Sequence, residues 1–101
     1  MTDEAFNRKI HEIEESGKSR FGEDNWKLCM EAIRRSTGNA GIPIDNMRQI
    51  ASTTDPAHLL FTAGKEILLN ESDNGNRESE IRYNAIRNEE REAHKRLRGR
   101  R

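Results

Sequence analysis

The sequence predicts an all-α protein, a small bundle of four short helices followed by a C-terminal basic helix or tail. Three observations support this prediction. The chain contains no valine, aromatic residues make up only 5% of it, and apolar residues recur at spacings of three and four rather than two. Because such spacings place side chains on one face of a helix, while β-branched and aromatic residues favour strands, helices are the expected elements.

The first helix is expected over residues 3 to 16. Thr2 is a suitable N-cap, because its hydroxyl can accept a hydrogen bond from a backbone N–H of the first turn. Gly17 is expected to end the helix, since glycine readily adopts the backbone conformation found at helix C-termini. The apolar residues of this segment follow one another at spacings of four and three: Phe6, Ile10 and Ile13.

The second helix is expected to begin at a cap supplied by Asp24 or Asn25 and to end at Gly38. Its apolar residues form one continuous face at positions i, i+3, i+4 and i+7: Trp26, Cys29, Met30 and Ile33. Cys29 lies at the centre of this face and is therefore predicted to be a small core residue. The GNAGIP stretch that follows contains two glycines and a proline, which predicts a loop.

A short third helix is expected over residues 44 to 52, and a longer fourth helix follows it. The fourth helix has an explicit start, because Asp55 or a preceding threonine can cap it and Pro56 occupies the first turn, where its missing N–H costs nothing. The residues expected to join the core from the connection after the first helix and from these two helices are Phe21, Met47, Ile50, Leu59, Leu60, Ala63 and Ile67.

Residues 1–70 are therefore predicted to form a helical core domain, residues 71–76 a polar break and residues 77–101 a basic helical tail. The tail has few apolar residues: Ile81, Ala85, Ile86, Ala93 and Leu97. Such a thin stripe suits docking on a partner better than forming a core, because isolated helices of this quality are marginally stable in water.

The charge of the chain is zero overall but unevenly distributed. Hydrophobic residues make up 32% of the chain and charged residues 36%. Met1–Glu31 holds five basic and eight acidic residues, whereas Arg87–Arg101 holds seven basic and three acidic ones. A basic tail can contact an acidic protein, a nucleic acid or a membrane surface, and the charge alone does not choose among them.

The chain lacks the sequence features of a secreted or membrane protein. Cys29 is the only cysteine, so no intramolecular disulfide can form, and the first residues lack the apolar core of a signal peptide. No apolar run approaches the roughly 18 residues that a membrane span needs. We expect a soluble protein of a reducing compartment, with no membrane partner.

No pattern in the sequence indicates catalysis, a metal site or a cofactor. The candidate soft and imidazole ligands lie in four separate segments without paired spacing: His11, Cys29, His58 and His94. Serine and threonine occur mainly in caps and linkers, and the glycine-containing loop lacks the Lys and Ser/Thr of a phosphate-binding loop. We expect a non-enzymatic protein without a metal or cofactor.

An alternative hypothesis is a helix-turn-helix nucleic-acid-binding protein, a small regulator or a packaging component. Ala51 would be the small residue on its first helix, but Asp55 stands where the turn usually has glycine. Pro56 and Ala57 also occupy the start of the second helix, where a recognition helix presents Arg, Lys, Asn or Gln. The residues that would contact nucleic acid under this hypothesis are Arg48, Thr53, Thr54, His58 and Lys65.

Three stretches, RFGEDNW, GIP and TTDPAHLLFTAGKE, occur in this order between residues 20 and 66. Together they resemble a segment of tailed-bacteriophage scaffolding-type and head-assembly proteins, in which an Arg-aromatic-acidic segment leads into a helix, a Gly-Ile-Pro loop follows, and an Asp-Pro-Ala helix ends in Leu/Phe-x-x-Gly-Lys. The matching residues cover less than half of the chain, which is also shorter than typical scaffolding proteins. They are Arg20, Phe21, Asp24, Gly41, Ile42, Pro43, Asp55, Pro56, Ala57, Leu60, Phe61, Gly64 and Lys65.

The resemblance implies a helical, non-enzymatic protein that binds coat or similar structural subunits, in the host cytoplasm or the virion. A homo-oligomer is expected, and contact of the basic tail with nucleic acid stays open. The residues expected to make the electrostatic contact with a partner are Arg87, Arg91, Lys95, Arg96, Arg98, Arg100 and Arg101. A second alternative is a small inhibitor of a host enzyme, with an acidic binding face around Glu12, Glu14 and Glu15.

Overall fold

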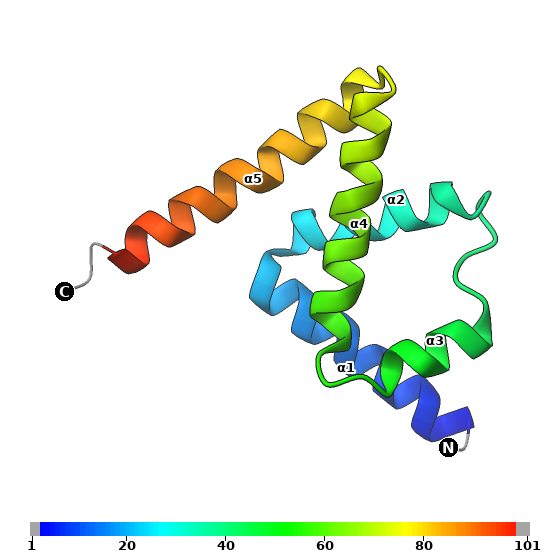
Figure 1. Ribbon diagram of the computed structural model, residues 1–101. Helices are drawn as coiled ribbons and strands as arrows, with labels where there is room; N and C mark the ends of the chain where they lie inside the picture. The colour runs from blue at the N-terminus through cyan, green and yellow to red at the C-terminus, as the bar shows by residue number, and fades with distance from the viewer. Residues whose placement is uncertain (1–2, 99–101) are drawn as a thin grey trace. The chain divides into compact units, whose positions relative to one another are not determined.

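The computed structural model describes residues 3–98, and for residues 96–98 it describes only the backbone. All regular secondary structure in this range is helical, which confirms the all-α prediction. Figure 1 shows the five helices, which are α1 (Asp3–Phe21), α2 (Glu23–Ser36), α3 (Ile44–Ala51), α4 (Pro56–Asp73) and α5 (Arg77–Arg98).

The chain forms two compact units, Met1–Ile67 and Leu68–Arg101, called here the N-terminal unit and the C-terminal unit. The N-terminal unit contains α1, α2, α3 and most of α4. The C-terminal unit contains the end of α4 and all of α5. Each unit is described by itself below.

Helix α1 runs through Gly17 to Phe21, so the sequence-based prediction that Gly17 ends it is wrong. Gly17 is buried within the helix, and a Cβ added there would overlap the indole ring of Trp26 on α2. Glycine at this point lets the two helices approach closely, and Trp26 is only 2% exposed. The chain turns into α2 at Gly22, whose φ of 93° is a backbone conformation that glycine adopts without strain.

Helix α2 begins with Gly22 in the N-cap position, rather than Asp24 or Asn25 as predicted. Asn25 lies buried inside the first turn, and its Nδ2 donates a hydrogen bond to the carbonyl of Phe21 at 3.3 Å. At the other end, Gly38 has φ 65° and ends the helix as expected. Two backbone hydrogen bonds from the residues after the cap to carbonyls of the last turn close this end.

Helix α4 crosses α2 where Gly64 faces Cys29. A Cβ added at Gly64 would lie 2.7 Å from both the Cα and the carbonyl oxygen of Cys29, so only glycine permits this approach. Cys29 has 0% exposure, which confirms the prediction that it is a core residue.

The core of the N-terminal unit agrees with most of the apolar periodicity, but Leu59 is 45% exposed and its predicted burial is wrong. Leu59 points away because the buried face of α4 passes through Ala57, Leu60, Phe61 and Gly64, which helix geometry places on the opposite side. The core residues are Phe6, Ile13, Trp26, Cys29, Ala32, Ile33, Ala51, Ala57, Leu60 and Phe61. The residues that were expected in the core and are half-buried are Ile10, Phe21, Met30, Met47, Ile50, Ala63 and Ile67.

In the C-terminal unit only three residues separate α4 from α5, so helical structure extends into the polar break expected at residues 71–76. Gly75 has φ 94°, a left-handed backbone conformation that glycine adopts without strain. This conformation lets the chain turn sharply at the end of α4. The N–H of Gly75 donates to the carbonyl of Ser72 at 3.0 Å, and the N–H of Asn76 donates to the carbonyl of Glu71 at 2.9 Å. These bonds satisfy carbonyls that the end of a helix otherwise leaves without partners.

The same corner also starts α5. The side-chain oxygen of Asn76 accepts a hydrogen bond from the N–H of Ser79 at 3.1 Å, which is the arrangement of a helix N-cap. The hydroxyl of Ser79 donates to Oε1 of Glu71 at 3.0 Å, and Ser79 has 0% exposure. A buried serine with a carboxylate partner therefore joins α4 to α5.

The less exposed residues of α5 lie on one helical face: Ser79, Arg82, Tyr83, Ile86 and Ala93. This face differs from the stripe that apolar residues alone suggested, because Ile81 is 59% exposed and Ala85 is also on the surface. Ile81 is consequently an exposed aliphatic side chain on a highly charged helix.

Candidate functional site

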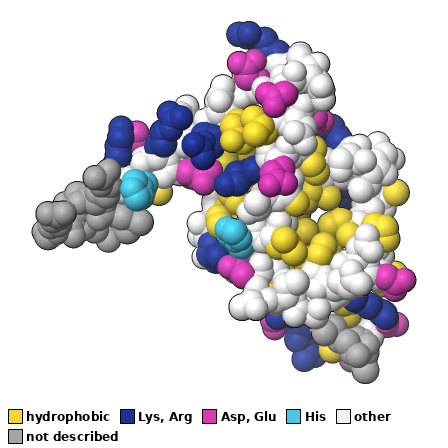
Figure 2. All heavy atoms as spheres, viewed as in Figure 1, with side chains coloured by type: hydrophobic (Ala, Val, Ile, Leu, Met, Phe, Trp, Pro, Cys, Tyr) yellow, Lys and Arg dark blue, Asp and Glu magenta, His cyan; other side chains and the backbone are white. Residues whose placement is uncertain are grey.

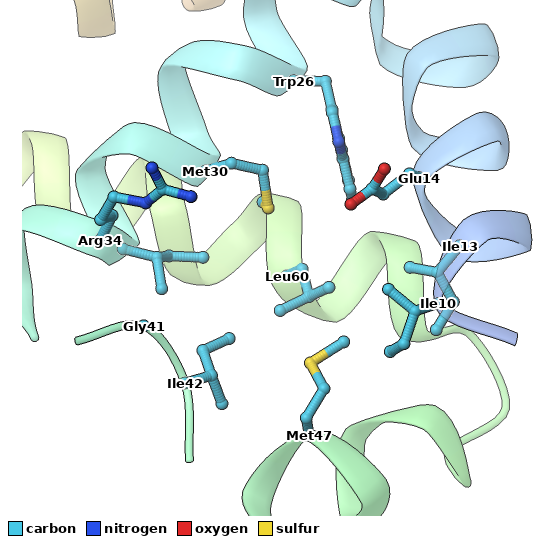
Figure 3. Close-up of a pocket in the computed structure, with 11 residues that line it drawn as sticks. Ile10, Ile13, Glu14, Trp26, Met30, Arg34, Gly41, Ile42, Met47 and Leu60 are labelled. Carbon is cyan, nitrogen blue, oxygen red and sulfur yellow. The ribbon is translucent and has the colours of Figure 1, made fainter. Parts of the chain in front are cut away.

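The N-terminal unit contains an apolar pocket of about 270 Å³ between α1, α2, α3, α4 and the loop that joins α2 to α3. Figure 3 shows side chains from these elements pointing toward a common centre. The residues that form its aliphatic and thioether wall include Ile10, Ile13, Met30, Ile42, Met47 and Leu60, and the ring of Trp26 lies beside them. We call this the apolar pocket.

The apolar pocket opens to solvent. Figure 2 shows hydrophobic atoms around a hollow in the surface of the N-terminal unit. Ile10, Met30, Ile42 and Met47 are only half-buried, so the pocket holds aliphatic surface in contact with water. Concave apolar surface of this kind marks sites that bind ligands or apolar side chains of other proteins.

Two opposite charges border the apolar pocket. Glu14 comes from α1 and Arg34 from α2, and both side chains are exposed. Neither side chain has an ion-pair partner among the described side chains, which are those of residues 3–95. The acidic face predicted from Glu12, Glu14 and Glu15 therefore contributes one residue to the pocket rim, while Arg34 and Ile42 were not among the predicted site residues.

Arg20 and Asp55 form a bidentate ion pair that joins the end of α1 to the start of α4. Nη1 and Nη2 of Arg20 donate to the two carboxylate oxygens of Asp55 at 2.8 and 2.9 Å. Asp55 also accepts a hydrogen bond from the N–H of His58 at 3.2 Å, so it is the N-cap that the sequence predicted for α4. The Arg20 hydrogen bonds, supported by that of His58, lower the pKa of Asp55 to about 2.

Stacked aromatic rings reinforce this junction. The rings of Phe21 and Phe61 are nearly parallel, with centroids 4.2 Å apart. The Arg20 guanidinium lies 4.9 Å from the centroid of the Phe21 ring, and the Lys65 ammonium lies 5.2 Å from that of Phe61. These ring contacts hold the first turns of α4, which contribute Leu60 to the apolar pocket, against the end of α1.

The basic residues of α5 gather on one side of that helix in the C-terminal unit. Arg87, Arg91, His94 and Lys95 occur at i, i+4, i+7 and i+8, and with Glu90 they border one shallow groove. We call this the basic face of α5. Lys95 pairs with Glu92 at 3.7 Å, whereas Arg87 and Arg91 make no ion pair within residues 3–98. Of the other residues expected to bind a partner, the side chains of Arg96 and Arg98 and all of Arg100 and Arg101 lie outside the described residues.

Four of the five residues proposed for nucleic-acid contact are engaged with neighbouring groups of the N-terminal unit. Arg48 lies 5.5 Å from the centroid of the Phe6 ring and pairs with Asp3 at 3.6 Å. The hydroxyl of Thr53 donates to the carbonyl of Ile50, and Thr54 is exposed beside the Arg20–Asp55 pair. The other two residues of this set lie against aromatic rings and are His58, beside Phe21, and Lys65, over Phe61.

No group of three or more His, Cys, Asp or Glu residues in the described part of the chain is arranged to hold a metal ion. None of the helices in the described range is long and apolar enough to cross a membrane.

Comparisons with known proteins give no relative for this chain. No protein-family model matches it, and neither the curated proteins nor the solved structures contain a significant match. The features of the molecule that bear on function are therefore the apolar pocket, the basic face of α5 and the residues around them.

Proposed function

We propose that this chain is a non-enzymatic assembly protein that associates with structural protein subunits of a bacteriophage or phage-derived particle. The basic face of α5 makes the contact with an acidic surface of the partner. The observation that carries this proposal is the pair of exposed guanidinium groups, Arg87 and Arg91, which lie one helical turn apart and have no ion-pair partner within residues 3–98.

The arrangement of α5 supports a contact with an extended partner surface. From Arg87 to Lys95 the basic face runs for about 12 Å, given a rise of about 1.5 Å per residue. Guanidinium groups bind carboxylates through paired hydrogen bonds, so a row of acidic side chains on a partner matches this face. The bacteriophage setting of the proposal comes from the three stretches RFGEDNW, GIP and TTDPAHLLFTAGKE, whose order resembles that in phage scaffolding-type and head-assembly proteins.

A protein partner is favoured over DNA by the start of α4. Asp55 is engaged with Arg20, and Ala57 is buried, so the first turn of α4 presents mainly His58 and Leu59 to solvent. Major-groove readers instead present several hydrogen-bonding side chains from the start of the recognition helix. Contact of the basic face with phosphates stays an alternative that experiment can separate.

The apolar pocket supports association rather than chemistry. Its wall is almost entirely aliphatic, thioether and aromatic, and the ionisable groups at its rim are Glu14 and Arg34. General acid–base or nucleophilic catalysis needs a nucleophile, a base and an orienting group in mutual contact. An apolar pocket with two charges at its rim has the composition of a docking site.

The test compares binding of poly-glutamate and of a short DNA duplex by two charge-reversed proteins. Arg87→Glu with Arg91→Glu alters the basic face, while Arg8→Glu with Lys27→Glu changes the net charge equally at exposed positions of the N-terminal unit. We expect the first pair to weaken poly-glutamate binding at least tenfold at low salt and the second to weaken it much less. Equal effects of the two pairs would contradict a specific role for the basic face. Preferential binding to DNA, lost steeply as salt rises, would establish the nucleic-acid alternative.

A further inference from the structure

We propose that the apolar pocket of one copy of this chain accepts the Ile81 side chain of a second copy. This inference rests on the assembly role proposed above, but it concerns a surface separate from the basic face of α5. The two surfaces can therefore be tested independently. Self-association through an apolar contact persists at high salt, whereas binding through exposed cations is screened.

The apolar pocket has the size and chemistry for an aliphatic side chain. Its volume of about 270 Å³ is enough for an isoleucine with part of the helix that carries it, and its wall is aliphatic on several sides. Half-buried Met30 and Met47 contribute thioethers, which adapt their rotamers to the shape of an incoming group. Filling this space removes water from apolar surface on both partners.

Ile81 is the most suitable occupant among the exposed aliphatic residues. Four large hydrophobic residues are exposed in the described part of the chain: Ile44, Leu59, Leu69 and Ile81. Ile81 has the highest exposure, 59%, and Ala85 lies beside it one turn later on α5. Because its neighbour one turn later is a small alanine, the Ile81 side chain projects from α5 with little steric obstruction around it.

The charges around the two surfaces are complementary. Arg77 and Glu78 flank Ile81 one turn earlier and are separated by about 100° around the helix axis. They therefore place one positive and one negative group on either side of the isoleucine, as Glu14 and Arg34 do at the rim of the pocket. Arg77 has no ion-pair partner within residues 3–98, and the Glu78 pair with Arg82 is a solvent-exposed one at 3.5 Å. When Ile81 enters the pocket, Arg77 lies opposite Glu14. Glu78 then lies opposite Arg34, so each charge at the rim gains an oppositely charged partner.

The pocket and the inserted residue lie on different surfaces of the same chain, so each copy carries one of each. Reciprocal insertion closes as a two-fold dimer, whereas insertion that repeats from copy to copy builds a ring or an open chain of subunits. The mass measured by light scattering separates these two arrangements.

The experiment is light scattering after size exclusion of the full chain over a rising concentration series at high salt. The wild type is expected to self-associate, and Ile81→Glu to weaken that association at least tenfold. Leu59→Glu is the matched control, since Leu59 is 45% exposed and points away from the buried face of α4 that carries Leu60. A wild type that stays monomeric, or an Ile81→Glu protein that associates like Leu59→Glu, would overturn the inference and leave the poly-glutamate test of the basic face unaffected.

Two further experiments separate the contact from any effect on folding. At low salt, where exposed charges are not screened, Glu14→Arg is expected to weaken self-association, and Arg77→Glu in the same chain is expected to restore it. Mixing Ile81→Glu with Ile42→Arg, which blocks the pocket, should give a heterodimer from two proteins that are each monomeric. That heterodimer has one intact pocket and one intact Ile81, so its absence when both variants show the wild-type helical circular dichroism would contradict the proposed contact.

Discussion

In the N-terminal unit the helices are joined by close apolar crossings, whereas in the C-terminal unit hydrogen bonds hold the corner between α4 and α5. Gly17 and Gly64 let Trp26 and Cys29 approach neighbouring helices in the first unit. In the second unit, Gly75 with its left-handed φ and the buried Ser79 hydroxyl shape the connection.

The two units also differ in how much surface they bury. The apolar crossings of the N-terminal unit bury enough surface to support a core and still leave the apolar pocket open. The C-terminal unit buries little beyond Leu68, Ser79 and Ile86 among the described residues, and it keeps its charges on the surface. The stability of the N-terminal unit should therefore depend on side-chain packing. The stability of the C-terminal unit should depend on the backbone conformation and hydrogen bonds at the corner between α4 and α5.

Gly64→Ala should give the largest effect. The new methyl group would press on the backbone of Cys29, which cannot move aside as a flexible side chain can. Overpacking typically costs 1–3 kcal/mol, and against backbone we expect a loss of about 3 kcal/mol in the free energy of unfolding. Urea unfolding followed by Trp26 fluorescence measures it, with exposed Glu66→Ala as the control on the same helix. Equal stability of the two variants would show that α2 and α4 do not cross as closely as described.

Leu60 and Leu59 offer a matched pair of neighbouring leucines with different burial. Leu60 is 4% exposed and Leu59 is 45% exposed. Leu60→Ala is expected to lower the free energy of unfolding by about 2–3 kcal/mol, and Leu59→Ala by less than about 1 kcal/mol, because only the first leaves an internal void. Denaturant unfolding of both variants checks the assignment, and the reverse order would place the buried face of α4 elsewhere.

Gly75→Ala tests the corner of the C-terminal unit. A left-handed φ costs a residue with a side chain about 1–2 kcal/mol, so α5 should lose protection against amide hydrogen exchange near its start. Trp26, the single tryptophan, lies in the N-terminal unit, and its unfolding midpoint should hardly change. Gly75→Asn should be milder, since asparagine tolerates this conformation better. A shift of the Trp26 transition as large as that caused by Leu60→Ala would contradict separate control of the two units.

Asp55→Asn should give the smallest effect, and one that depends on pH. The pKa of Asp55 is lowered from 3.8 to about 2 in the folded protein, mainly by Arg20. Its ion pair therefore contributes stability above about pH 4, and that contribution is lost as the pH falls toward 2. Asparagine can still accept the capping hydrogen bond but carries no charge. The difference in urea midpoint between wild type and variant should be present at pH 6 and should close toward pH 2; a difference independent of pH would contradict the ion-pair interpretation.

The sequence predicted where the helices lie along the chain better than how closely they approach one another. The apolar face of Trp26, Cys29 and Ile33 could be predicted because its spacing is a local property. The role of Gly17 could not be predicted, because glycine is locally typical of a helix end. In the structure Gly17 lies inside α1, where the absence of a side chain leaves room for the Trp26 ring.

The candidate sites were predictable to different degrees for similar reasons. The basic face of α5 follows from the spacing of its cations along one helix. The apolar pocket depends on Ile42 in a loop and on Met30 and Leu60 from separate helices, so no single segment indicates it. The buried face of α5 includes Ser79, whose burial becomes favourable only through its hydrogen bond to Glu71.

The most direct test of the assembly role is light scattering after size exclusion at low and high salt, with and without a short DNA duplex. We predict an oligomer that persists at high salt and whose mass does not change when DNA is added. A monomer that shifts only with DNA, and loses that shift as salt rises, would contradict the assembly role and establish nucleic-acid binding instead.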